Sequence, residues 1–124
     1  MEINEIKAGV LKCLSDSLAI STEDISVSAT LISDLGVDSL DILDISFSLE
    51  KHFNIKLRGT SLDELLKMDF KIDANGQLSE SDIKRFQSWM PSLSQSNAKE
   101  IKPVDLFNYI TVESLILLVQ QQLK

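Results

Sequence analysis

A serine lies between two aspartates in the segment Asp34-Leu35-Gly36-Val37-Asp38-Ser39-Leu40-Asp41. Gly36 suits a turn, because a residue without a Cβ adopts backbone angles that other residues avoid. Asp38 and Ser39 are both common helix-capping residues, and apolar residues with helical spacing follow them. The segment therefore predicts a turn that leads into a helix over residues 39–53.

This predicted helix carries more apolar side chains than one buried stripe can hold. They are Leu40, Ile42, Leu43, Ile45, Phe47, Leu49 and Phe53. Some of them must therefore face solvent, a partner or a cargo cavity. Asp38, Asp41 and Asp44 recur every three residues, so we expect them along one flank of the helix. The first two lie near the positive end of the helix dipole, where each carboxylate gains about 0.3–1 kcal/mol.

Further helices are predicted on either side of this segment. Apolar residues repeat with helical spacing over 3–18, and Thr111 is a good N-cap for a last helix whose apolar residues continue to Leu123. Within 58–102, we expect a short helix capped by Ser61, a turn at 73–76, a helix from Ser79 to about Trp89 and a polar loop at 92–99. The pattern predicts an all-α fold of three or four principal helices with an extra helical insert.

The segment 34–41 and the order of these helices resemble the acyl carrier proteins and their attachment motif. The resemblance covers residues 1–57 and 103–124, the expected carrier core of a single domain over 1–124, and makes 58–102 an insert. It implies an acyl-carrier-protein-like bundle in which a phosphopantetheinyl transferase attaches a 4′-phosphopantetheine arm to Ser39. The arm would hold acyl groups as thioesters, and the chain would have no catalytic activity of its own.

The residues around Ser39 agree with a modification site. No histidine or lysine adjoins it to act as a base, so it is not expected to be a catalytic nucleophile. The amides of a helix N-terminus can accommodate a phosphate. The simpler explanation, that Asp38 and Ser39 only cap a helix, suits this dipeptide but not the full eight-residue segment with the helices around it.

Carboxylates are poorly placed to hold a phosphate, so we expect them to dock basic patches of partner enzymes. The predicted docking residues are Asp38, Leu40, Asp41, Asp44, Phe47 and Glu50. The resemblance implies two kinds of partner, the transferase and the acyl-transferring enzymes of fatty-acid or lipid synthesis. Lys51 lies where many family members are acidic, which would weaken or retune that end of the surface.

Residues 40–45, together with Phe47, Lys51, Phe53 and 55–56, resemble one specialised branch of the family. Members of that branch deliver very long acyl chains to lipid A in Gram-negative bacteria. The insert at 58–102 departs from the ordinary family pattern. Our hypothesis is that it adds helices beside the cargo pocket, for longer cargo or for a dedicated acyltransferase.

The charge of the chain is concentrated in its first half. The formal net charge is −7, and residues 1–57 hold ten acidic and four basic residues, a net of −6. A negative field disfavours nucleic acid and anionic lipid, although acidity can also serve solubility alone. The longest apolar run, 115–119, is too short to span a bilayer. We therefore expect a cytoplasmic monomer without nucleic-acid binding or membrane insertion.

Other residues of the chain carry weaker signals. Cys13 is the only cysteine and is expected to be a buried or partly buried, inert thiol. His52 is expected at the surface or at a helix end. Phe86 and Trp89 are expected in the core. Residues 71–82 resemble a calcium-binding loop, but Lys71 occupies the first ligand position, where such a loop has a carboxylate. The alternatives are a peptidyl or aminoacyl carrier and a non-carrier calcium-binding or scaffold protein, and no metal site is predicted.

Overall fold

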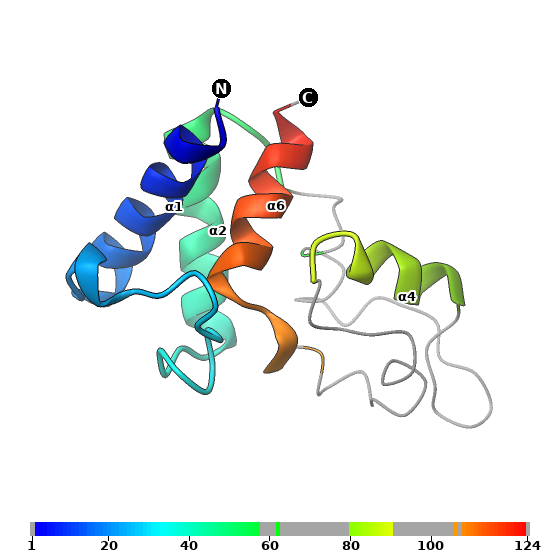
Figure 1. Cartoon of the computed structure of the whole chain (residues 1–124), viewed down its shortest axis with the longest axis horizontal. Coiled ribbons are helices and arrows are strands. Elements are labelled where there is room, and N and C mark those ends of the chain that lie inside the picture. Colours follow the sequence, from blue (N-terminus) through cyan, green and yellow to red (C-terminus); the bar gives the residue numbers. More distant parts are fainter. Residues whose placement is uncertain (1, 58–61, 63–79, 91–105, 107, 124) are drawn as a thin grey trace.

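The computed structural model describes residues 2–57, 62, 80–90, 106 and 108–123. Its helices are α1 (Ile3–Leu18), the 3-10 helix η1 (Thr22–Asp24), α2 (Ser39–Phe53), α4 (Glu80–Gln87) and α6 (Val112–Gln122). In Figure 1, α1 runs antiparallel to α2 and α6, and α4 lies on the side of α6 away from α1. The all-α prediction is confirmed, and α1 and α2 have the predicted bounds.

One hydrophobic core joins these helices. Buried residues recur on α1 and α2 with the helical spacing of an inward face, and α1 packs against both α2 and α6. The buried apolar residues of these three helices are Ile6, Val10, Cys13, Leu14, Ile42, Ile45, Leu49, Phe53, Val112, Leu115, Ile116, Leu118 and Val119. Since fully burying one such side chain contributes about 1.5–3 kcal/mol, this shared core is the main source of stability.

Gly9 lets α1 approach the end of α2. A Cβ at this position would overlap Cζ of Phe53 and lie 2.9 Å from Nε2 of His52. The Phe53 ring is buried and packs edge-on against the exposed His52 ring, with 4.8 Å between the ring centroids. The expected helix-end position of His52 is confirmed, and the two rings leave no room for a larger residue at position 9.

Cys13 lies on the buried face of α1 and is a free thiol. Burial raises the pKa of the Cys13 thiol, and the negative charge of Asp16 raises it further, while Lys12 opposes these effects. The thiol is therefore protonated near neutral pH and weakly nucleophilic. The predicted burial of Cys13 is confirmed.

The described part of the insert packs onto the same core. Helix α4 ends at Gln87 and a turn follows, so the helix stops two residues before the predicted Trp89. Phe86 and Trp89 are buried, as predicted, and Gln121 on α6 donates from Nε2 to the carbonyl of Ser88 at 3.0 Å. The insert predictions at Ser61, 73–76, Ser79 and 92–99, and most of the calcium-loop-like segment 71–82, lie outside the described residues.

Replacing Gly9 by leucine should destabilise the protein by about 1–3 kcal/mol, because overpacking would force the Phe53 and His52 rings to move. Chemical denaturation measures the change in the free energy of unfolding. Ala8→Leu is the matched control, because Ala8 is exposed on the same helix and leucine is a good helix former. Equal stability of the two variants would contradict the close approach of α1 and α2.

Candidate functional site

A turn closed by hydrogen bonds precedes α2 and leads the chain into the start of this helix. The amide of Thr30 donates to Oδ2 of Asp34 at 2.8 Å, and the amide of Asp34 donates back to Oγ1 of Thr30 at 3.1 Å. Gly36 then adopts a positive φ of 71°, and its amide donates to the carbonyl of Ile32. An added Cβ at Gly36 would meet nothing within 4 Å, so the glycine serves the backbone angle and not close packing.

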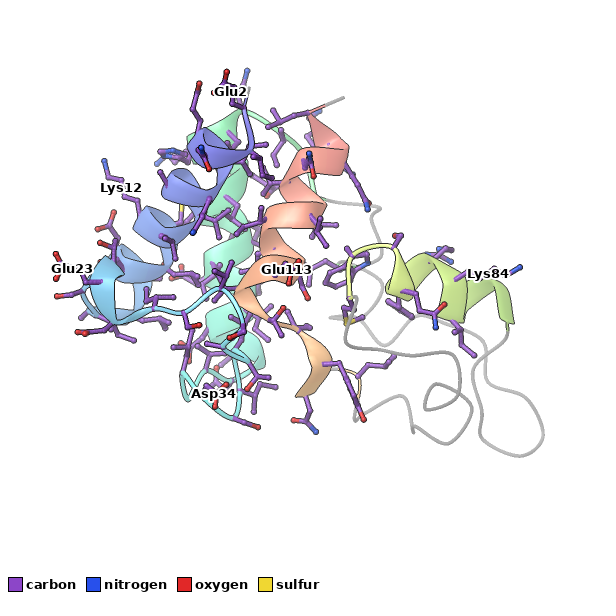
Figure 2. The ribbon with its side chains drawn as sticks, in the orientation of Figure 1. Glu2, Lys12, Glu23, Asp34, Lys84 and Glu113 are labelled. Atoms are coloured by element: carbon purple, nitrogen blue, oxygen red, sulfur yellow. The ribbon has the colours of Figure 1, made fainter. Side chains whose placement is uncertain are left out.

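Backbone hydrogen bonds tie this turn to the start of α6. The amide of Leu31 donates to the carbonyl of Ile110, and the amide of Val112 donates to the carbonyl of Ala29, both at 3.0 Å. The amide of Glu113 reaches the carbonyl of Val27 at 2.9 Å. Figure 2 shows Asp34 in the loop before α2 and Glu113 near the start of α6. The entry to α2 is thus held by a segment about 80 residues away in the chain.

Two buried residues anchor the turn to the core. Leu31 and Val37 are almost completely buried, and the amide of Val37 donates to the carbonyl of Leu31 at 3.0 Å. Between them, the polar residues of the loop stay at the surface. The turn is therefore fixed from inside by apolar burial and from its ends by hydrogen bonds.

A capping box opens α2. The Asp38 side chain accepts through Oδ1 from the amide of Asp41 at 2.8 Å, and Oδ2 of Asp41 accepts from the amide of Asp38 at 3.1 Å. The box uses two of the amides at the helix start. The other two backbone amides of the first turn belong to Ser39 and Leu40. Amides at a helix N-terminus favour a phosphate.

Ser39 is the first residue of α2, and the positions around it are open to solvent. Gly36 and Asp38 are exposed, and Leu40 is 73% exposed. A helix start with two amides outside the capping box and with exposed flanking residues fits a phosphate-linked group attached at this position. This conclusion rests on the backbone at the start of α2 and on the exposure of Asp38 and Leu40 beside Ser39.

An apolar stripe lies on the exposed side of α2. Leu40, Leu43 and Phe47 are 73%, 38% and 50% exposed, and Asp44 is exposed beside them. Their spacing of three and four residues places them on one face of the helix. The prediction that part of α2 faces outward is confirmed. Leu43 was missing from the predicted docking residues, although its position between Leu40 and Phe47 places it on that face.

The predicted acidic docking residues differ in how free their carboxylates are. Asp38 and Asp41 each hold a backbone amide in the capping box. Glu50 is half-buried, and its Oε2 accepts from the amide of Leu57 at 2.8 Å, which fixes the chain after α2. Asp44 is exposed and makes no side-chain hydrogen bond or ion pair to the described residues. Its carboxylate is therefore the freest of the four to meet a basic partner.

The described residues offer little for other kinds of chemistry. They contain no group of three histidine, cysteine, aspartate or glutamate side chains that could hold a metal ion. None of the helices in the described ranges is long and apolar enough to cross a membrane. His52 lies in the last turn of α2, at the opposite end of the helix from Ser39.

Known proteins match this region of the chain. Residues 8–67 match the family described as "Phosphopantetheine attachment site". An acyl carrier protein of Nitratidesulfovibrio vulgaris (strain DP4) is 29% identical over 68 residues, which cover 55% of this chain and 90% of that protein. An acyl carrier protein of the Miyazaki F strain is also 29% identical, over 63 residues that cover 51% of this chain and 83% of that protein.

A further relative is similar over a shorter stretch. The "Acyl carrier protein AcpXL" of Mesorhizobium japonicum is 44% identical over 48 residues, which cover 39% of this chain and 52% of that protein. Over this region the chain is thus similar to proteins that carry acyl groups, and the match to a phosphopantetheine attachment site supports a covalently attached 4′-phosphopantetheine arm.

Proposed function

We propose that Ser39 carries the arm and that the chain presents acyl thioesters to enzymes of fatty-acid or lipid synthesis. The observation that carries this proposal is the place of Ser39 as the first residue of α2, between an exposed Asp38 and an exposed Leu40. The matched region 8–67 includes this position. A helix start held by long-range backbone bonds would give a modifying enzyme a fixed target.

The chemistry at Ser39 needs an enzyme. The bond formed joins Oγ of Ser39 to the phosphorus of phosphopantetheine, and the bond broken is the pyrophosphate link of coenzyme A, with 3′,5′-ADP leaving. The hydroxyl must lose its proton, and His52 lies at the far end of α2. The transferase would therefore supply the base, and this chain the acceptor oxygen and the recognition surface. When bound, the arm supplies a terminal thiol for thioester formation.

The docking surface of the proposal is the exposed stripe of α2. It comprises Leu40, Leu43, Asp44 and Phe47, which we call the docking face. An apolar stripe next to a free carboxylate suits a partner with an apolar groove and a basic rim, because charge steers the encounter and apolar contact holds it. Asp38, Asp41 and Glu50 would contribute their negative charge while each keeps a structural hydrogen bond.

The proposed cargo is a very long acyl chain destined for lipid A. The resemblance of residues 40–45, with Phe47, Lys51, Phe53 and 55–56, to the specialised branch supports this. The insert also supports it, because α4 adds buried residues to the core of a carrier domain over 1–124. Mass spectrometry of the thioester on protein purified from its own host tests the cargo, and an aminoacyl or peptidyl thioester would contradict it.

Ser39→Ala should abolish attachment of the arm, because no other oxygen would lie at this position. The measurement is intact-mass spectrometry after incubation with coenzyme A and a broad-specificity transferase. Ser33→Ala, at an exposed serine in the preceding turn, should gain the full mass of the arm. A mass gain on the Ser39→Ala protein would refute the assignment.

Phe47→Ala and Asp44→Lys should each lower kcat/KM for arm attachment by about three- to tenfold, since each removes part of the docking face. Stability should change little, because both residues are exposed. Ile3→Ala and Glu23→Lys are matched controls: Ile3 is 48% exposed on α1, and Glu23 is an exposed acid in η1. Equal losses in the controls would show that the docking face has no special role.

Asp38→Ala should lower the free energy of unfolding by about 0.5–2 kcal/mol, because the amide of Asp41 loses its cap. Asp38→Asn should retain most of the stability, since the amide oxygen of asparagine can still accept that bond. Both variants should slow arm attachment if the charge of Asp38 aids docking. Urea denaturation and transferase kinetics measure the two effects, and equal destabilisation by Asn and Ala would contradict the capping role.

A further inference from the structure

Among the described residues, the buried polar side chains of the core are satisfied with one exception. Ser46 donates to the carbonyl of Leu43 at 2.6 Å, and Thr111 and Ser114 cap α6 through reciprocal hydrogen bonds of 3.1 Å. Trp89 is 0% exposed, and its Nε1 is the one buried side-chain nitrogen or oxygen in the described residues that lacks a hydrogen-bond partner.

An unpaired indole N–H in a closed core is costly. A buried donor without an acceptor loses its hydrogen bond to water and gains none in the protein, and buried tryptophans usually find a partner. A phenylalanine would provide a similar apolar ring at this position without that cost. The donor therefore requires an explanation beyond packing.

The position of Trp89 links this donor to the insert and to the carrier core. The residue follows α4, packs at an angle against the Phe86 ring, and belongs to the same buried cluster as residues of α1, α2 and α6. Its neighbour Ser88 is held by Gln121 of α6. A ligand that entered this core would meet apolar side chains and one free donor, which is the usual composition of a small-molecule site.

We propose that the indole N–H of Trp89 binds an oxygen atom of the acyl cargo when the cargo enters the core. This inference rests on the proposed carrier function and adds a specific binding group to it. The oxygen can come from the thioester carbonyl or from a hydroxyl or oxo substituent on the chain. An alkyl chain alone offers no acceptor, so the donor favours cargo whose oxygen reaches Trp89.

The first test observes the donor directly in the unaltered protein. Trp89 is the only tryptophan, so its indole ¹⁵N–¹H pair gives a single NMR signal. The signal is compared between the apo protein, the protein with the arm alone, and forms carrying saturated, hydroxy or oxo chains of equal length. The proton should shift downfield on acylation and not with the arm alone.

The pattern of shifts identifies the acceptor. A shift with every acyl form assigns the thioester carbonyl, and a shift only with hydroxy or oxo chains assigns the substituent. No shift in any acyl form, or an equal shift with the arm alone, would overturn the proposal. Failure of the arm to attach would instead refute the proposed function, so the two failures are distinguishable.

The second test removes the donor and keeps an apolar ring. In Trp89→Phe, cleavage of the thioester by hydroxylamine should be about two- to tenfold faster, because the cargo would spend more time outside the core. Ser88→Ala is the control, since Ser88 is exposed and immediately precedes Trp89, and its rate should match the wild type. An unchanged rate in a folded Trp89→Phe protein would contradict the proposal. If that variant does not fold, the NMR test on the unaltered protein decides the question.

Discussion

The backbone pairing between residues 27–31 and 110–113 is the constraint on which the site depends. It joins the loop before α2 to the start of α6 through three amide–carbonyl bonds, and Leu31 is buried beside it. Without this pairing, only local turns and the burial of residues such as Leu31 and Val37 would direct the loop of 19–38 into α2. The N-terminus of α2 is therefore placed by the last helix of the bundle as much as by its own sequence.

The start of α2 combines structural and functional demands in the same residues. A helix N-terminus needs side-chain acceptors for its free amides, and a docking surface for basic partners needs carboxylates. In the proposed carrier, Asp38 and Asp41 would meet both demands, because a carboxylate that accepts one amide keeps its charge and a second oxygen. Asp44 lies beyond the first turn and caps no amide. It differs in this from Asp38, Asp41 and Glu50, which each accept a backbone hydrogen bond.

The described part of the insert contributes buried residues to the core of this protein. Apolar residues of α4 and of the turn after it are buried with those of α1, α2 and α6, and Gln121 fixes the turn to α6. A carrier that shelters a chain between helices gains interior surface from such an addition. The cost is the unpaired N–H of Trp89, and a cargo oxygen would remove that cost.

Local patterning was sufficient to place α1, α2 and α6, because helical periodicity, caps and the turn at Gly36 are short-range properties. The resemblance of residues 34–41 to the acyl carrier attachment motif selected Ser39 as the candidate site. It also indicated that α2 has an outward apolar face. It could not show that Glu50 holds the amide of Leu57, that Gly9 accommodates two aromatic rings, or that Trp89 lacks a partner. These features were settled in the folded protein, because each depends on which groups meet there and not on the periodic pattern of any one helix.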